Sequence, residues 1–336
     1  MNIDSRLLAD ASISTASQSG GRPSEVADAR LDDAARAGWL YYIAGKTQDD
    51  IARALNVSRP TAQRLVSLCR SERLITFHMN HPISKCMSLA VQLTERYGLA
   101  QCEVVPTDGS AETSFVAVAE AAAIFIERLL RMNHAMVIGV GTGRSMRASV
   151  ERVTPMQRPL HRLVSLVGNI SPDGSASPFD ALTKLAELTK SQYFPMPLPM
   201  HASTPAQRDL LLEVESVKRI FAMAGAADVW LTGIGQIDQD AILYRDGFIT
   251  RDELLALIRA GGVGEYAGWV FDVKGQFLTD GTNTRVTSIP VTAAQQTRIC
   301  IANGASKVIP LRSALNGRIM NGLVTDESTA AALLRS

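Results

Sequence analysis

The stretch KTQDDIARALNVSRPTAQRLVSLCRSER, from Lys46 to Arg73, has the pattern of two short helices joined by a tight turn. Thr47 is placed to cap the first helix, with Asp50 three residues later as in a capping box, and Ser58 is placed to cap the second. Asn56 suits the turn because asparagine tolerates the left-handed backbone conformation. These local signals together predict a helix-turn-helix.

Apolar and polar residues of this stretch divide between two sides of the predicted helices. Apolar residues recur at helical spacing on the inner side: Ile51, Ala52, Leu55, Leu65, Val66 and Leu68. The polar residues at the caps and on the outer side are the predicted DNA contacts: Thr47, Gln48, Ser58, Arg59, Thr61, Gln63 and Arg64. In this arrangement the N-terminal residues of the second helix enter the major groove. Five Arg and one acid between Ile51 and Arg73 give a local charge of +4, which favours DNA binding over a purely structural helical hairpin.

The flanking residues complete a predicted DNA-binding domain over residues 25–82. Residues 1–24 are rich in Ser, Ala and Gly without a continuous apolar core, which predicts a disordered tail and not a signal peptide. Residues 25–45 have helical apolar spacing and predict a helix that packs behind the motif. Residues 75–79 alternate like a short strand, which makes the domain winged-helix-like, and Pro82 marks its end.

Composition limits the class of protein. The 336 residues have a formal charge of +1, with 46% hydrophobic and 20% charged residues, which indicates a globular protein whose contact with DNA is a local patch. The four cysteines are scattered without a C-x-x-C pair, which fits the cytoplasm and predicts no metal site and no cofactor. Since no apolar run approaches the ~20 residues that span a bilayer, no membrane contact is expected.

From residue 83 onward, apolar strand-like segments alternate with amphipathic helical ones. This alternation predicts an α/β fold with a doubly wound, largely parallel sheet and helices on both faces. The predicted strands are 101–106, 135–140, 161–168, 192–198, 228–234, 268–273, 285–291 and 298–302. The predicted helices are 84–97, 110–133, 178–190, 205–224, 250–259 and 306–316. Ligands of such sheets bind beyond the carboxyl ends of the strands, so residues 83–336 are predicted to form an effector-binding domain.

Gly-rich or polar loops follow several of these strands and supply the candidate effector-binding residues. They are Gly141, Thr142, Gly143, Arg144, Ser145, Asn169, Gly235, Gln236, Glu265 and Lys307. The G-x-G-x-G spacing after strand 135–140 lets a backbone approach a ligand, but it is neither a dinucleotide fingerprint nor a P-loop, and a packing role is the alternative. Lys307 opposes the dipole of the helix that it begins, so helix stability does not explain it. Glu265 can accept hydrogen bonds from sugar hydroxyls, and Lys307 can donate to hydroxyl or phosphate oxygens.

Over residues 30–336 the chain resembles the SorC/DeoR-type family of sugar-binding bacterial transcriptional regulators. The resemblance rests on TQDDIARALNVSRPTAQRL, VIGVGTGRS, LTGIGQID, GGVGEYAGWVFDVKG and NGASKVIPLRSALNGRIMNGLVTDESTAAALL. It implies an effector domain similar to glucosamine-6-phosphate deaminase and ribose-5-phosphate isomerase that acts as a sensor and not as a catalyst. It also implies that residues 141–145 form the effector loop, with Glu265 and Lys307 as polar partners. This loop has Gly-Arg-Ser where phosphate-sensing members tend to have further Thr or Gly, so Arg144 either clamps a phosphate or blocks it.

The main hypothesis is a cytoplasmic transcriptional regulator, a repressor or an activator, whose affinity for operator DNA is controlled by a sugar, polyol or sugar phosphate. A palindromic operator requires at least a dimer, and the resemblance implies a tetramer, so the expected assembly is a homo-oligomer, either dimer or tetramer.

Two other hypotheses come from different classes of protein. The first is a sugar-phosphate isomerase or deaminase with an appended helical domain, in which Glu265 is the general base. No second acid or His accompanies Glu265 in the loops, so no catalytic residue is predicted; His134, His161 and His201 fall before or inside strands, where core roles are expected. The second is a DNA-binding module on a purely structural oligomerisation domain, which needs none of the polar loops.

Overall fold

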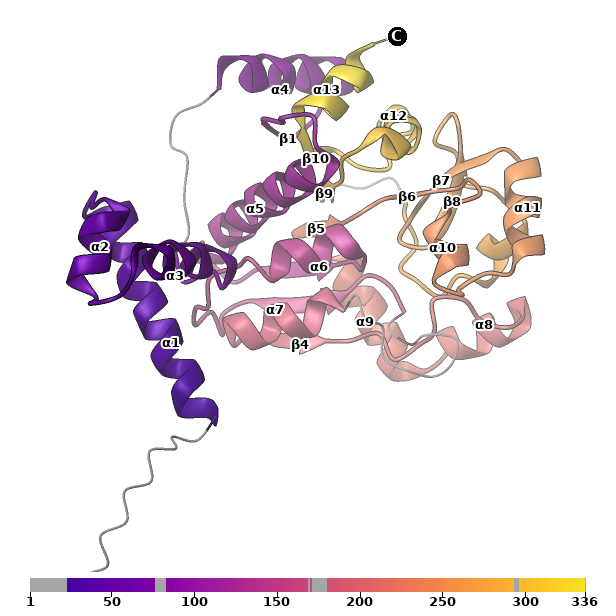
Figure 1. Ribbon diagram of the computed structural model, residues 1–336. Helices are drawn as coiled ribbons and strands as arrows, with labels where there is room; N and C mark the ends of the chain where they lie inside the picture. The colour runs from indigo at the N-terminus through magenta and orange to yellow at the C-terminus, as the bar shows by residue number, and fades with distance from the viewer. Residues whose placement is uncertain (1–22, 76–82, 169, 171–179, 293–295, 336) are drawn as a thin grey trace, which may run out of the picture. The chain divides into compact units, whose positions relative to one another are not determined.

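The computed structural model describes residues 23–75, 83–168, 170, 180–292 and 296–335 (Figure 1). The chain divides into two compact units, residues 1–81 and residues 82–336. The smaller unit is helical in its described part, and the larger unit is built on a parallel sheet. Residues 1–22 of the expected tail and residues 76–79 of the expected wing strand lie outside the described residues.

The smaller unit contains three α-helices and a π-helical turn in its described part. They are α1 (Pro23–Gly38), the π-turn η1 (Trp39–Ile43), α2 (Gln48–Ala54) and α3 (Arg59–Ser71). Ala34 and Ala37 of α1 are fully buried and pack with the apolar residues of α2 and α3, so the helix expected behind the motif is present. Trp39 and Ile43, which belong to the segment 25–45 expected to pack behind the motif, lie in the π-turn and are 58% and 64% exposed.

The larger unit is organised by a seven-stranded parallel sheet with the order β1-β10-β9-β5-β2-β3-β4. Its strands are β1 (Gln101–Val105), β2 (Val137–Val140), β3 (Arg162–Ser165), β4 (Gln192–Phe194), β5 (Val229–Thr232), β9 (Thr297–Ile301) and β10 (Gly322–Asp326). The chain runs outward from β2 to β4 on one side and from β5 to β10 on the other. The sheet therefore has a topological switch point between β2 and β5.

Helices cover both faces of this sheet (Figure 1). They are α4 (Ser84–Tyr97), α5 (Ala111–Leu130), α6 (Arg144–Val150), α7 (Ala181–Thr189), α8 (Pro205–Leu212), α9 (Glu215–Gly225), α12 (Val308–Asn316) and α13 (Glu327–Leu334). Neighbouring residues of β5 show the division: Val229 and Leu231 pack with α5, α6 and α7, whereas Trp230 packs with α4, α9, α12 and α13. The alternation arises because successive side chains of a strand point to opposite faces. The predicted helix 205–224 is two helices, broken where Val214 has extended backbone.

A three-stranded antiparallel sheet is inserted between β5 and β9. It consists of β6 (Gly235–Gln236), β7 (Gly262–Tyr266) and β8 (Trp269–Asp272), with α10 (Ile242–Arg245), α11 (Arg251–Arg259) and the 3-10 turn η2 (Gly281–Arg285) beside it. The segment 261–266, expected to be a loop, is largely strand β7: a Cβ at Gly264 would lie 2.4 Å from the Phe271 ring, so glycine there serves close strand packing. The predicted strand at 285–291 is wrong, because this segment begins in η2 and forms only an isolated bridge between Val286 and His201.

Candidate functional site

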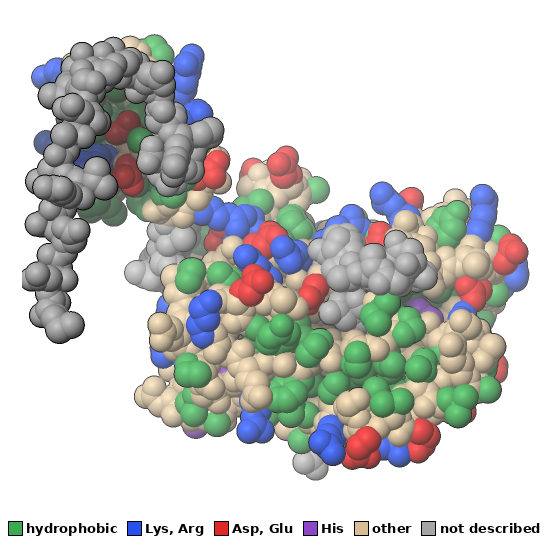
Figure 2. All heavy atoms as spheres, turned by 90° about the horizontal axis from the view of Figure 1, so that it is seen from below, with side chains coloured by type: hydrophobic (Ala, Val, Ile, Leu, Met, Phe, Trp, Pro, Cys, Tyr) green, Lys and Arg blue, Asp and Glu red, His purple; other side chains and the backbone are tan. Residues whose placement is uncertain are grey.

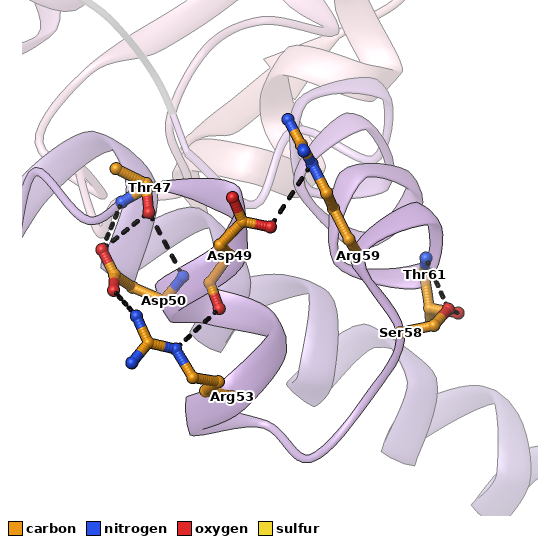
Figure 3. A network of polar contacts seen from close by, with 7 residues as sticks. All are labelled: Thr47, Asp49, Asp50, Arg53, Ser58, Arg59 and Thr61. Carbon is orange, nitrogen blue, oxygen red and sulfur yellow. Dashed lines mark hydrogen bonds and ion pairs between the residues drawn. The ribbon is translucent and has the colours of Figure 1, made fainter.

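Both helices of the pair in the smaller unit begin with the caps expected from the sequence. The Thr47 hydroxyl accepts a hydrogen bond from the Asp50 N–H, and the Asp50 carboxylate accepts one from the Thr47 N–H, which completes a capping box (Figure 3). The Ser58 hydroxyl accepts a hydrogen bond from the Thr61 N–H at the start of α3. Asn56 has a φ of 52°, so the left-handed turn is confirmed.

The apolar side of the pair is buried, and most of the predicted DNA contacts are on its surface. Ile51, Ala52, Leu65 and Val66 form the core of the unit, with Leu55 and Leu68 partly buried beside them. Of the predicted contacts, the exposed residues are Thr47, Ser58, Arg59, Gln63 and Arg64, and the half-buried ones are Gln48 and Thr61.

The arginines of this surface are not equally free to meet DNA. Arg53 forms an ion pair with Asp50, and the Arg59 Nε lies 3.5 Å from the Asp49 Oδ1 (Figure 3). Asp49 and Asp50 lie just before residues 51–73, so they reduce the positive charge of the helix pair. Arg64 is exposed and has no ion-pair partner among the described residues, so it keeps its full charge for a partner molecule.

In the larger unit, loops at the carboxyl ends of strands β2, β5 and β9 surround a cavity of about 450 Å³. This volume is within the range of small-molecule sites, roughly 300–1,000 Å³. β2 leads through Gly143 into α6, β5 leads into β6, and β9 leads through Asn303 into the 3-10 turn η3 (Ala305–Lys307). The cavity therefore opens beside the switch point, where a doubly wound sheet binds its ligands.

Most of the predicted effector-binding residues line this cavity. Those that do are Thr142, Gly143, Arg144, Ser145, Gly235, Glu265 and Lys307. Gly141 does not: a Cβ there would lie 2.3 Å from the Thr232 Oγ1, and its N–H donates to the Leu231 carbonyl, so its role is the packing of β2 against β5. Gln236 contributes through Lys307, whose Nζ donates a hydrogen bond to the Gln236 Oε1. Asn169 lies outside the described residues.

Glu265 and Lys307 place opposite charges in partly dehydrated surroundings. Burial raises the pKa of Glu265, although a hydrogen bond from the Gly268 N–H (2.9 Å) and the charge of Lys307 act in the opposite direction. Burial also lowers the pKa of Lys307, with Glu265 opposing this shift and Arg144 adding to it. Both side chains thus have charges that an incoming polar ligand would help to stabilise.

The loop that carries Asn303 is fixed by the beginning of α13. The Asp326 carboxylate caps this helix by accepting a hydrogen bond from the Thr329 N–H, and it also accepts one from the Asn303 Nδ2. The Thr329 hydroxyl accepts a hydrogen bond from the Gly304 N–H. Burial alone would raise the pKa of Asp326, but these donors outweigh it and hold the pKa below its usual value. The segment NGLVTDEST therefore positions one wall of the cavity.

Sequence reasoning missed several cavity residues, most of them apolar. They are Phe115, Val167, Met200, Thr232, Gly233, Ile234, Ile242, Ala267, Gly268 and Asn303. Of these, Thr232 ends β5, and Gly233 and Asn303 stand in the loops after β5 and β9. These loops were expected to hold the ligand, which is a sequence signal, but the three residues were not selected as contacts. Phe115 of α5 and Met200 have no such signal, because only the tertiary structure brings them to the cavity.

The His, Cys, Asp and Glu side chains of the described residues nowhere gather in groups of three suited to a metal ion. None of the described helices combines the length and apolar character of a membrane span.

Comparisons with known proteins agree with this architecture. A family model described as "Putative sugar-binding domain" matches residues 81–335. The erythritol catabolism regulatory protein EryD of Brucella abortus is 34% identical over 310 residues, which cover 92% of this chain and 98% of EryD. The transcriptional regulator LsrR of Klebsiella pneumoniae is 29% identical over 308 residues, which cover 89% of this chain and 92% of LsrR. The structure of the full-length sorbitol operon regulator SorC of Klebsiella pneumoniae matches with a TM-score of 0.70 and 27% identity, over 92% of this chain and 99% of SorC. This chain therefore belongs to the SorC/DeoR-type family of sugar-binding transcriptional regulators.

Proposed function

We propose that this regulator binds operator DNA through α3 and changes its operator affinity when a sugar, polyol or sugar phosphate occupies the cavity beside β2, β5 and β9. The observation that carries the proposal is the convergence of Arg144, Lys307 and Glu265 on that one cavity. The two cations suit hydroxyl or phosphate oxygens, and the carboxylate suits hydroxyl hydrogens. The relative EryD is named for erythritol, a four-carbon polyol, which is a ligand of this chemistry.

In the DNA-binding part of the proposal, residues 25–82 form the DNA-binding domain, α3 is its recognition helix, and α2 crosses the DNA backbone. Support comes from the capped pair of helices and from Arg59, Gln63 and Arg64, which are exposed at the N-terminal half of α3. In helix-turn-helix proteins this part of the second helix reaches the base edges of the major groove. Such a regulator acts where the operator is, in the cytoplasm of a bacterium.

The proposed assembly is a homo-oligomer, a dimer or tetramer, because two recognition helices must meet the two halves of a palindromic operator. Large hydrophobic side chains are exposed on the larger unit, among them Tyr193 on edge strand β4 and Leu210 and Val214 around α8. Figure 2 shows hydrophobic side chains gathered on one face of this unit. Apolar surface of this kind is common where protein subunits meet. Sedimentation velocity would give the oligomeric state.

An enzymatic role has one observation in its favour. Glu265 lines the cavity and has a raised pKa, which is a property of many general bases. However, no His, Asp or second Glu is found among the described residues of that lining. His161 is buried against the Leu130 carbonyl as expected, His134 is exposed and not in the core, and His201 lines a different cavity. We expect no turnover of ribose 5-phosphate or glucosamine 6-phosphate, and steady turnover abolished by Glu265→Gln would reverse this assignment.

Thermal shift measurements with sugars, polyols and their phosphates test the proposed effector site. At a ligand concentration 100 times the Kd, binding stabilises the folded chain by about 2.7 kcal/mol, and for a domain of this size the melting temperature then rises by roughly 5–10 °C. Lys307→Ala and Thr142→Ala should abolish the shift and leave operator binding intact, since both residues line the cavity.

Lys274→Ala is the matched control, because Lys274 is exposed and lies outside the cavity lining. It should keep the full shift. If Lys307→Ala and Thr142→Ala are still stabilised by the same compounds as the unmodified protein, the effector binds elsewhere and the proposed site is wrong.

A further inference from the structure

A second cavity adjoins the effector cavity, and Met200 lines both. The second cavity has a volume of about 480 Å³ and is lined by residues 199–203, 247–250, Gln207 of α8, Glu253 of α11 and Arg285 of η2, among others. Within the described residues, Met200 alone belongs to both linings. Met200 is buried, with 5% of its surface exposed, so its side chain lies inside the protein where the two linings meet.

The backbone at Met200 is anchored, whereas its side chain can change conformation. The Met200 carbonyl accepts a hydrogen bond from the Thr287 N–H (3.0 Å), and the next residue, His201, bridges to Val286. The side chain packs over Gly268, where a Cβ would lie 3.1 Å from the Met200 Cγ. Methionine has several rotatable bonds and adapts to irregular spaces. A change of the Met200 rotamer can therefore connect the two cavities without moving the backbone at Met200 and His201.

The chemistry of the second cavity differs from that of the first. Arg285 and Glu253, the two charged residues of its described lining, form an ion pair with each other, so this part of the lining offers no uncompensated charge. Both ring nitrogens of His201 are buried and have no hydrogen-bond partner among the residues that the structure describes. Burial lowers the pKa of His201 to about 4, with the charge of Arg285 adding to the shift, so the ring is neutral at pH 7. A neutral imidazole has one donor and one acceptor, a combination that hydroxyl groups satisfy.

The geometry points to Met200 as a specificity-determining residue, and to the second cavity as a subsite for an uncharged, hydroxylated extension of the effector. A short polyol fits beside Arg144, Lys307 and Glu265 with Met200 in place. A longer ligand, such as a disaccharide alcohol, displaces the Met200 side chain and places its second ring near His201. This inference rests on the proposed function, because it extends the same binding site.

Isothermal titration of the full chain with erythritol, sorbitol and maltitol tests the inference. Met200→Ala removes the side chain that lines both cavities and should strengthen maltitol binding by about tenfold relative to erythritol and sorbitol, the scale of one side-chain contact in a specificity pocket. Met200→Leu, which conserves volume, should keep the order of affinities of the unmodified protein. Adding His201→Ala to Met200→Ala should remove the gain for maltitol alone, because only the longer ligand reaches His201.

The outcomes separate this inference from the function on which it rests. If the polyols bind and Thr142→Ala abolishes their binding, but Met200→Ala leaves the order of affinities unchanged, the inference is wrong and the proposed function stands. A gain for maltitol that persists in the double variant also overturns the subsite at His201. If neither the unmodified protein nor Met200→Ala binds any of these compounds, the proposed function fails for polyols and the inference fails with it. Melting curves without ligand establish that each variant is folded.

Discussion

Replacing Arg64 with alanine should weaken operator binding more than replacing Arg59, because, of these two arginines, Arg59 alone forms an ion pair within the described part of the chain. The Arg59 Nε lies 3.5 Å from the Asp49 Oδ1, and both side chains are more than half exposed. An exposed pair of this kind contributes about 0.2–1 kcal/mol, whereas an arginine contact to a guanine edge contributes about 1–3 kcal/mol. Arg64→Ala should therefore raise the Kd by about 5–150-fold. Arg59→Ala should weaken operator binding by less than Arg64→Ala does. The difference should equal the energy of the Arg59–Asp49 ion pair, which DNA binding must break.

Fluorescence anisotropy with a labelled operator duplex at several salt concentrations measures both effects. A contact to a phosphate, once lost, lowers the salt slope of log Kd by about 1 and weakens all sequences alike. A contact to a base edge leaves that slope unchanged and relaxes the preference at one base pair. Asp49→Ala should strengthen binding, since it frees Arg59 and removes a negative charge from the surface that faces DNA.

The control is Arg162→Ala, which removes an exposed arginine of β3 in the larger unit and should leave the Kd unchanged. Because Arg59 and Arg64 are exposed, their replacement should change the free energy of unfolding by no more than about 0.5 kcal/mol. Unchanged operator affinity in both variants would refute the assignment of α3 as the recognition helix. Equal losses for Arg64→Ala and Arg162→Ala would show that only overall charge matters.

Three further predictions concern the larger unit. Gly141→Ala should lower the melting temperature and weaken effector binding, since the new Cβ would lie 2.3 Å from the Thr232 Oγ1. Adding Thr232→Ala to Gly141→Ala should recover part of the melting temperature and part of the effector affinity. No recovery would contradict the role of Gly141 in packing against Thr232. Asp326→Ala should lower the free energy of unfolding by about 1–3 kcal/mol through the lost helix cap and hydrogen bonds, and effector affinity should fall because Asn303 loses its anchor; urea denaturation and titration measure the two effects. His201 has its pKa lowered to about 4 by burial, so the unfolded chain takes up its proton first as the pH falls below about 6.5. Stability should decrease between about pH 6.5 and 4 by about 3 kcal/mol, and urea denaturation of His201→Phe across this range should show a smaller decrease.

Local signals were sufficient for the helix pair of the smaller unit. A cap depends on a side chain and on backbone groups two or three residues away, so Thr47 and Ser58 could be assigned from the sequence. Asn56 could be assigned because few residues adopt a left-handed conformation without strain. The ion pair between Arg59 and Asp49 could not, since it depends on how α3 packs against α2.

Prediction failed where a strand or a cavity wall depends on distant neighbours. β7 contains Gly262 and Gly264, which resemble loop residues, yet a Cβ at either would lie within 2.9 Å of a side chain of β8. β10 was not predicted, because it is a short, fully buried strand with a brief apolar run. Met200 reaches the cavity through a segment that follows β4, the edge strand of the sheet. Glycine-rich and polar loops in the sequence therefore predict only the residues of the cavity that lie at the strand ends.

The cavity is lined by residues of both the main parallel sheet and the three-stranded sheet, and this division affects how an effector can act. Arg144 and Lys307 extend from the main sheet, whereas Gln236 and Glu265 belong to the three-stranded sheet. The hydrogen bond from Lys307 to Gln236 links these parts. A ligand changes an equilibrium only by its difference in affinity for the two states. An effector that takes over Lys307 and also binds Glu265 therefore favours one position of the three-stranded sheet. A compound that binds only the main-sheet loops and leaves the hydrogen bond between Lys307 and Gln236 in place would leave operator affinity unchanged, however tightly it binds.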